Sequence, residues 1–318
     1  MDKQLTVIVP AYNVENYLEQ ALDSCIIQNM ESLEVLVVND GSTDGTYEIA
    51  KRYEEIYPAC FKAINKANGG YGSVLNYGIE HANGRYLKVL DGDDWFNSSA
   101  LASFIEKAPS INSDVVGFSY AEIDDISKAS IIKRDIPIEA EGDYKAAAML
   151  GKSASMHSFI YKTGLVRNCQ IDFPEHCLYT DTILVTVVLD VSDTVYIFPQ
   201  DLYQYRVGRE GQSVDPRVRA RKLNDMHKVL SYLMASLDFS SSHNGFAWSQ
   251  CLGKFDIQYK EIYRLLNGDR EMIRQLNQIA SSNAVFVKSL AKTSRVARIS
   301  LACNGLFSPY VAKMKGFM

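Results

Sequence analysis

The sequence lacks several features that would place it in a special class of protein. Its 318 residues contain no apolar run of about 20 residues, the length that a helix needs to cross a bilayer. The apolar stretch near the N-terminus is short and contains Pro10, which does not fit a secretory signal. The six cysteines form no CxxC pair and fit neither a zinc site nor a dense disulfide framework. We therefore expect free thiols in a reducing cytoplasm.

Proline and positive charge are also scarce. The chain has 8 prolines and is 47% hydrophobic, which excludes a disordered or collagen-like protein. Its net charge is −5, so the composition does not favour nucleic-acid binding. Acidic residues are missing from 272–318, where the basic residues are Arg274, Lys288, Lys292, Arg295, Arg298, Lys313 and Lys315.

Short apolar runs alternate with helix-like stretches over about the first 120 residues. The runs, rich in β-branched residues, are 5–10, 33–40, 61–65, 85–91 and 114–119. The helix-like stretches between them are 15–29, 45–57, 71–83 and 98–108. This alternation predicts an α/β fold with a Rossmann-like, mostly parallel sheet flanked by helices.

The pattern changes twice further along the chain. Shorter strands are predicted at 157–161 and 195–198, with loops between them. Beyond about residue 218, leucines and other apolar residues recur at steps of three or four, which is typical of amphipathic helices. We therefore predict an α/β domain over 1–217 and a helical C-terminal region over 218–318.

Polar side chains follow three of the predicted strands. They are Asn13, Asn39, Asp40, Asp44, Asp91, Asp93 and Asp94, and no Lys or Arg lies in the three loops that carry them. The carboxyl ends of parallel strands meet at one edge of the sheet, where ligands bind. Grouped carboxylates repel one another unless a cation lies between them, and oxygen ligands favour Mg²⁺ or Mn²⁺.

The Asp-x-Asp spacing is suited to such a cation. In an extended loop Asp91 and Asp93 point to the same side, and Gly92 between them allows a ligand to approach the backbone. A hard cation held by one or two carboxylates completes its shell with phosphate oxygens, which points to a nucleoside diphosphate. The alternative is a set of ordinary turn and cap residues.

Several segments together resemble the bacterial family-2 glycosyltransferases, which have the GT-A fold. They are VIVPAYN, LEVLVVNDGSTDGT, the stretch ending in KVLDGDDW, YTDTILV and YQYRVGREGQS. The resemblance covers about residues 5–215, and its specificity lies in the combined order of the segments. It implies that 1–217 is a GT-A domain that binds a nucleotide sugar and carries the catalytic residues.

The resemblance also implies roles for residues of the first strand ends. Pro10, Tyr12 and Glu15 match positions that line the nucleotide base pocket in the family. Asp40 matches the acidic residue that reads the uracil edge, and a carboxylate is a suitable acceptor for uracil N3–H. Three residues match positions near the ribose and diphosphate: Lys66, Asn68 and Gly70.

The resemblance implies that the diphosphate and the cation bind at the end of the fourth predicted strand. Asp91 and Asp93 match the family's DxD pair, with Asp93 as the more direct metal ligand and Asp94 in a supporting or helix-capping position. Arg206 resembles a residue of a family loop near the diphosphate, as does Ser213 further on, and Arg206 could stabilise charge on the leaving group. The alternative for Arg206 is an ordinary surface arginine.

The general base should lie on the acceptor side. Asp181 matches the acidic residue that precedes an apolar helix in the family, although this chain has Thr180 where a Glu is usual. We interpret Asp181 as the base, with a helix N-cap as the alternative. His157 could lie beside the acceptor, but a structural histidine is the simpler interpretation.

These assignments predict an inverting glycosyltransferase. It would move a sugar from a nucleotide sugar, most simply a UDP-sugar, to a hydroxyl of a glycan or lipid-linked saccharide, assisted by Mn²⁺ or Mg²⁺. One alternative is a sugar-phosphate nucleotidyltransferase, but the loop after the first strand lacks the Gly-rich, basic sequence expected there. A second is a non-catalytic sugar-binding or scaffold subunit. Association with further copies of the chain is left open.

The basic segment 272–318 suggests contact with a membrane surface. Basic residues are attracted to an anionic leaflet, and apolar side chains from the charge-free run 299–312 could be buried at the interface. We therefore predict peripheral membrane association. The alternative is that the segment folds back onto the acidic body as ordinary helices, and Gly305 and Pro309 would interrupt a long amphipathic helix.

Overall fold

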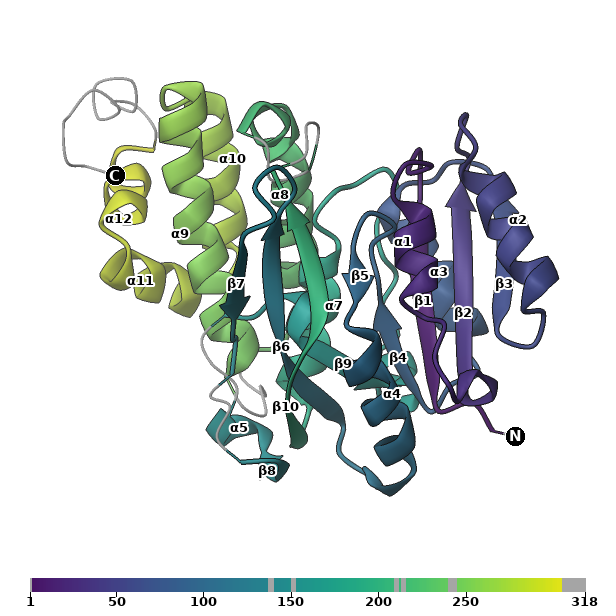
Figure 1. Ribbon diagram of the computed structural model, residues 1–318. Helices are drawn as coiled ribbons and strands as arrows, with labels where there is room; N and C mark the ends of the chain where they lie inside the picture. The colour runs from purple at the N-terminus through teal and green to yellow at the C-terminus, as the bar shows by residue number, and fades with distance from the viewer. Residues whose placement is uncertain are drawn as a thin grey trace.

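The computed structural model describes residues 2–136, 140–149, 153–208, 212, 216–239 and 245–304. In these ranges the chain forms a ten-stranded sheet with helices on both faces and a group of helices beyond one end (Figure 1). The strand order is β3-β2-β1-β4-β9-β6-β10-β5, with β7 and β8 paired at the margins.

One half of the sheet is parallel, as the sequence predicts. It consists of β1 (Leu5–Ala11), β2 (Leu33–Asp40), β3 (Phe61–Lys66) and β4 (Tyr86–Val89). All residues of β2 and β4 are buried, because helices cover both faces of the sheet. The carboxyl ends of β1, β2 and β4 therefore meet at one edge.

The other half of the sheet is mixed. β9 (Phe159–Lys162) lies between β4 and β6 (Val115–Asp124) and is antiparallel to both, whereas β10 (Thr194–Val207) is parallel to β6. The sequence predicts only 195–198 of β10, because Pro199 and the two polar residues after it interrupt the apolar pattern. The strand continues past them through an irregular register. Three shorter strands are antiparallel to their neighbours: β5 (Trp95–Phe96), β7 (Ser130–Lys133) and β8 (Gly142–Lys145).

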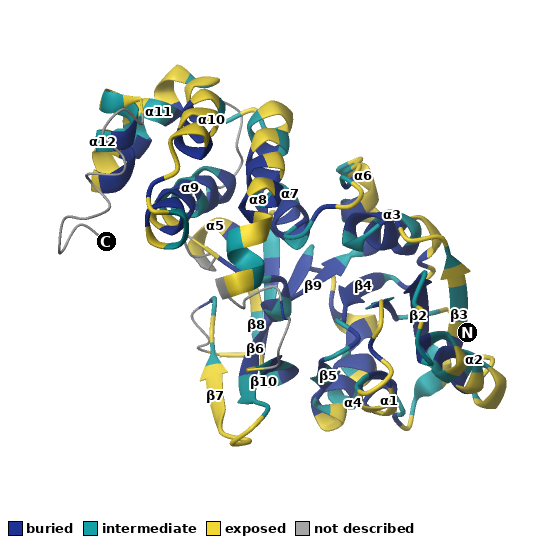
Figure 2. Ribbon diagram, turned by 90° about the horizontal axis from the view of Figure 1, so that it is seen from above, coloured by how far each residue is buried: buried dark blue, intermediate teal, exposed yellow. Residues whose placement is uncertain are grey.

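Helices cover the two faces of the parallel half (Figure 2). On one face lie α1 (Leu18–Asp23), α2 (Thr46–Ile56) and α4 (Ser98–Lys107). On the other lie α3 (Tyr71–His81) and α6 (Thr163–Asn168). A further short helix, α5 (Ala146–Met149), follows β8.

Alternate residues of β1 contribute to the two apolar cores. Val7 packs in the core that includes Leu18 of α1, and Ile8 packs in the core that includes Val74 of α3. Helix α1 is shorter than the predicted 15–29, because the chain turns at Ser24. There the backbone N–H of Phe96 donates to the Ser24 hydroxyl at 3.0 Å and ties the helix end to β5.

The C-terminal region is helical, as predicted. Its helices are α8 (Pro216–Ser236), α9 (Phe246–Leu266), α10 (Arg270–Ser281), α11 (Ala284–Thr293) and α12 (Arg295–Cys303). Helix α9 packs along α7 (Asp181–Val191), and one continuous apolar cluster joins these helices to the α3 face of the sheet. The region thus shares its core with the sheet, and the division near 218 stays a prediction.

The described part of the basic segment packs onto the body of the protein. Phe286, Leu290 and Val296 are buried in the cluster shared with α9, which matches the fold-back alternative for 272–304. Residues 305–318, which include most of the apolar run 299–312, lie outside the described residues. Within the part of the chain that is described, no helix has the length and apolarity needed to span a bilayer.

Candidate functional site

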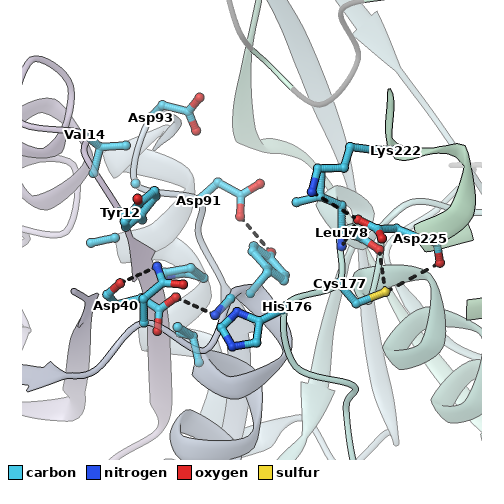
Figure 3. A pocket seen from close by; sticks show the side chains of 17 residues that line it. Tyr12, Val14, Asp40, Asp91, Asp93, His176, Cys177, Leu178, Lys222 and Asp225 are labelled. Atoms are coloured by element: carbon cyan, nitrogen blue, oxygen red, sulfur yellow. Dashed lines mark hydrogen bonds and ion pairs between the residues drawn. The ribbon is translucent and has the colours of Figure 1, made fainter. Parts of the chain in front are cut away.

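A cavity of about 450 Å³ opens where β1, β2 and β4 end (Figure 3). Its opposite wall is made of segment 176–178 and of Lys222 and Asp225 on α8. The sequence-predicted residues that line it are Pro10, Tyr12, Asp40, Asn68, Gly70, Asp91, Gly92 and Asp93. Those that lie outside its lining are Glu15, Lys66, Asp181 and Arg206. The three strand ends and a C-terminal helix therefore enclose one site.

The carboxylate of Asp40 is held in a cradle of donors. Its Oδ1 accepts from Lys66 Nζ at 2.8 Å and from the N–H of Gly69 at 2.9 Å, and its Oδ2 accepts from the N–H of Gly70 at 2.7 Å. Asn68 Nδ2 donates to the backbone oxygen of Asp40 at 2.7 Å. Lys66 therefore acts as the partner of Asp40 behind the cavity and contributes no surface to the cavity wall.

Gly70 is required by geometry at the start of α3. Its φ is +81°, and a Cβ at this position would lie 3.0 Å from the backbone nitrogen of His176. A side chain would be strained by the backbone conformation and would also push away the facing segment. The absence of a side chain lets segment 176–178 close against the strand-end side of the cavity.

The loops after β1 and β2 are joined by hydrogen bonds. The N–H of Thr43 donates to Asn13 Oδ1 at 2.9 Å, and the N–H of Gly45 donates to Glu15 Oε2 at 2.7 Å. Glu15 therefore clamps the two loops together outside the cavity. Tyr12 presents a half-exposed aromatic ring (53% exposed) at the cavity wall, where a planar ligand could stack on it.

Asp91 and Asp93 place two carboxylates on the cavity wall. Asp91 Oδ1 accepts from the hydroxyl of Tyr71 at 2.7 Å. Burial, and then the negative charges of Asp93 and Asp181, together raise the pKa of Asp91 to about 7, against the hydrogen bond from Tyr71. The site thus holds negative charge that a bound cation would compensate.

The donor set fits a hard divalent cation that also binds the ligand. Among the described residues, no group of three or more His, Cys, Asp or Glu side chains is placed to hold a metal ion. The protein would therefore supply only Asp91 and Asp93, and the remaining ligands would be diphosphate and water oxygens. That division is the usual one for Mg²⁺ at phosphate-binding sites.

Asp94 points away from the cavity into the protein. It is buried, with Oδ2 accepting from the hydroxyl of Tyr203 at 2.7 Å and Oδ1 accepting from the N–H of Arg206 at 2.8 Å. Burial, and then the charges of Asp93 and Asp91, raise its pKa well above the usual range. Asp94 therefore anchors the Asp-x-Asp loop to β10, in line with the supporting position predicted for it.

Arg206 has a different setting from the one predicted. It is buried behind the Asp-x-Asp loop, where Nε donates to the Asp93 carbonyl at 2.8 Å, one terminal nitrogen to Asp125 Oδ1 at 2.5 Å and the other to Gln20 Oε1 at 2.6 Å. Two aromatic rings enclose the guanidinium at 4.9 and 4.8 Å, those of Tyr17 and Trp95. Its partners are protein groups that fix the loop, and Ser213, the accompanying residue, lies outside the described residues.

This arrangement predicts a large loss of stability in Arg206→Met. The substitution removes three hydrogen bonds of a buried guanidinium, to the Asp93 carbonyl, Asp125 and Gln20. Hydrogen bonds to charged groups contribute about 1.5–3 kcal/mol each, so we expect a loss of about 3 kcal/mol or more. Urea unfolding should show that loss. Lys128→Met is the matched control, since Lys128 pairs with the same Asp125 at 3.0 Å but is exposed; it should cost less than about 1 kcal/mol. Equal losses would show that Arg206 is not an anchor.

Asp181 lies at the first position of α7, after Thr180 at the N-cap. Burial raises the pKa of Asp181, while Lys254 of α9 and the N–H groups at the helix start lower it. Although it does not line the cavity, its charge raises the pKa of both Asp91 and Tyr71. Asp181 therefore belongs to the same acidic group, and its role as base stays a prediction.

Lys88 and His157 form a buried layer behind the site. Lys88 Nζ donates to the carbonyls of Met156, His157 and Phe159 at 2.6–3.0 Å, and burial lowers its pKa to about 7. The His157 ring stacks on Tyr205 at 4.5 Å, and burial lowers its pKa to about 3. Neither side chain lines the cavity, which agrees with the structural interpretation of His157.

Other residues of the cavity were missed in the sequence. Tyr71 could have been found, because it follows Gly70 at the start of a predicted helix. The others carry no recognisable motif: His176, Cys177, Leu178, Lys222 and Asp225. The segment 176–178 is held at the cavity by the hydrogen bond from the His176 N–H to the Gly69 carbonyl at 2.7 Å, and α8 is placed there by its packing on α7, α9 and α10.

Solved structures with the same fold define the class of the protein. The first 349 residues of TarS from S. aureus, solved with UDP-GlcNAc, match 97% of this chain and 91% of that one, with a TM-score of 0.67 and 19% identity. The mannosyltransferase PcManGT from Pyrobaculum calidifontis, solved with GDP-Man and Mn²⁺, matches 100% and 85%, with a TM-score of 0.54 and 15% identity. Together with a site at the strand ends, this likeness defines a GT-A-type fold.

The sequence comparisons name the family. Residues 6–163 match the model of Glycosyl transferase family 2. The Glycosyltransferase GlyA of Streptococcus pneumoniae is 31% identical over 218 residues, which are 65% of this chain and 31% of GlyA. The Minor teichoic acid biosynthesis protein GgaB of Bacillus subtilis is 29% identical over 249 residues, 75% of this chain and 27% of GgaB. Residues 6–163 are a glycosyl transferase family 2 domain, and the chain spans less than a third of the length of these two relatives.

Proposed function

We propose that the protein is an inverting glycosyltransferase that uses a nucleotide sugar, most simply a UDP-sugar, and a divalent cation. The observation that carries this proposal is the pair Asp91 and Asp93 on the wall of a cavity at the ends of β1, β2 and β4. A site that combines two carboxylates with an exposed aromatic ring, Tyr12, along the strand ends suits a cation-bound diphosphate joined to a planar base.

The geometry of the cavity supports the proposed donor-binding roles. Asp40 has a carboxylate oriented by Lys66 and by the start of α3, and it lines the cavity where it could accept from uracil N3–H. Asn68 and Gly70 line the wall beside it, toward the ribose and diphosphate. TarS and PcManGT were solved with a uridine and a guanosine diphosphate sugar respectively, so the choice of base needs a direct test.

The chemistry requires a base and a stabilised leaving group. The cation held by Asp91 and Asp93 would neutralise negative charge on the departing nucleoside diphosphate. Asp181 would take the proton from an acceptor hydroxyl as its oxygen attacks the anomeric carbon. A single displacement on an α-linked nucleotide sugar gives a β-linkage without a covalent enzyme intermediate. The acceptor would be a glycan or a lipid-linked saccharide.

A panel of nucleotide sugars tests the proposal. Slow release of UDP, GDP or TDP in the presence of Mn²⁺ identifies the donor, and the assay is then repeated with candidate acceptors. Release of one nucleotide that depends on Mn²⁺ supports the proposal. No binding or release with any donor would favour the alternative of a non-catalytic subunit.

The pKa of Asp91 predicts how nucleotide binding depends on pH. Because that carboxyl is protonated below pH 7 in the free protein, the cation must displace its proton there. Affinity for UDP with Mn²⁺ should therefore fall by up to about tenfold per pH unit below 7 and level off above it. Calorimetry between about pH 5.5 and 8.5 measures this. Asp91→Asn is the control, since it keeps the pH dependence of UDP and of the other carboxylates near the site; identical profiles would remove Asp91 as a cation ligand.

Peripheral membrane contact also stays a prediction. It now concerns mainly the residues beyond Asn304, because Phe286 and Leu290 of the same basic segment are buried in the core. A truncation that tests it should end at 304, which leaves that core intact. The 1–318 chain should co-sediment with anionic vesicles at low salt, and the 1–304 truncation should bind less. Equal binding by the two proteins would contradict the prediction.

A further inference from the structure

A second concave surface lies beside the nucleotide cavity, between α8 and α10. This α8–α10 groove has a volume of about 930 Å³. Lys222 and Asp225 line both the groove and the nucleotide cavity, so the two adjoin at these residues. A molecule that extends from the cavity along α8 would therefore enter the groove.

The groove is rich in hydrogen-bond donors and positive charge. Helix α8 contributes Arg221, Lys222 and Lys228, all exposed, whereas Asp225 is the single carboxylate among the described residues that line it. Asp225 lies 3.8 Å from the Lys222 nitrogen and 3.6 Å from that of Lys228, which brings the two lysines toward one place. The α10 side adds amide side chains, including that of Gln275. The net charge of the lining is positive.

His227 gives a second and independent indication of a ligand. It lines the groove and is only 5% exposed. Among the described residues neither ring nitrogen makes a hydrogen bond of normal geometry, and the side chain of Gln275 is the neighbour that interacts with the ring. Burial lowers its pKa to about 4, opposed by Gln275, so the ring is neutral and carries one N–H donor. A buried donor without a good partner is destabilising, and a ligand oxygen in the groove would satisfy it.

We propose that the α8–α10 groove binds a phosphate group of the acceptor. Arg221, Lys222 and Lys228 supply charge, and His227 supplies an N–H. Phosphate oxygens accept from several directions at once, which suits donors on both helices better than a planar carboxylate does. This assignment rests on the proposed function, which places the donor diphosphate at Asp91 and Asp93 and leaves the groove for the acceptor. A soluble phosphate ester and a lipid headgroup share the required chemistry.

Histidine-selective NMR tests the groove directly. The chain has five histidines, so the His227→Gln variant assigns the His227 signal. Glycerol 3-phosphate is titrated in the presence of saturating UDP and Mg²⁺, which occupy the nucleotide cavity. The His227 signal should shift saturably, and the apparent affinity should fall at least about tenfold in Arg221→Ala/Lys228→Ala. Lys288→Ala, which removes an exposed lysine from α11, should leave the titration unchanged.

Further measurements separate the sources and the alternatives. Glucuronate in place of glycerol 3-phosphate should cause no saturable shift, because it offers only a carboxylate. Co-sedimentation with phosphatidylglycerol vesicles that the double variant abolishes, without a shift by the soluble ester, would assign the same chemistry to a lipid headgroup. No response to either probe, or a response that the double variant retains, would overturn the proposal.

These experiments test the groove and the nucleotide site separately. Arg221 and Lys228 do not line the nucleotide cavity, so the double variant should bind UDP with Mn²⁺ as the wild type does. Absence of UDP binding in the wild type would count against the proposed function. The His227 titration would still report on the groove, because it does not require sugar transfer.

Discussion

Asp93→Ala is expected to bind UDP in the presence of Mn²⁺ roughly ten to a hundred times more weakly than the wild type. Asp93 and Asp91 are the carboxylates that line the cavity from the Asp-x-Asp loop, and losing a charge-assisted contact costs about 1.5–3 kcal/mol. The loss should vanish when EDTA removes the metal, since Asp93 would act on the nucleotide through the cation. Calorimetry with and without Mn²⁺ measures both effects.

Asp193→Ala is the matched control for this experiment. Asp193 is an exposed carboxylate just before β10 and does not line the cavity, so its removal changes the net charge by the same amount. It should leave UDP affinity within about twofold, because exposed charges at a distance are screened by salt. Equal affinity of Asp93→Ala and the wild type with Mn²⁺ would remove Asp93 as a metal ligand.

The strand ends could be predicted because local sequence determines them. The runs that form β1, β2 and β4 are mostly apolar, and parallel strands between helices must be buried on both faces. Asn13, Asp40 and Asp91 lie at the ends of those runs or within two residues of them, so their positions could be predicted with the strands. The edge at which they meet is then set by topology alone.

The far wall of the cavity could not be predicted, because it depends on tertiary packing. Lys222 and Asp225 belong to an amphipathic helix whose pattern shows which face is buried but not what it packs against. Arg206 illustrates the same limit. Its motif places it near the Asp-x-Asp loop, but only the structure shows that its guanidinium faces Asp125 and Gln20 behind that loop. The length of β10 was underestimated for a similar reason. Pairing with its neighbouring strands carries it through Pro199, where the local sequence predicts an end.

Asp181→Asn is expected to retain donor binding and to lose transfer by roughly 10²–10⁴-fold. The amide is similar in size but cannot accept a proton from the acceptor hydroxyl. Burial raises the pKa of Asp181, which makes the carboxylate a stronger base than an exposed one once it is ionised. Transfer is measured with the donor and acceptor found in the panel, and UDP affinity is measured by calorimetry in the same buffer.

The pH dependence of transfer separates a base from a helix-start residue. If Asp181 is the base, wild-type transfer at saturating donor should fall as the pH drops through its raised pKa, and Asp181→Glu should recover part of the rate that Asp181→Asn loses. A carboxylate that only stabilises the first turn of α7 is worth about 0.3–1 kcal/mol, which would appear as a lower melting temperature. Asp181→Asn that turns over normally but melts earlier would assign Asp181 to the helix, and the base would have to be sought among other groups on the acceptor side.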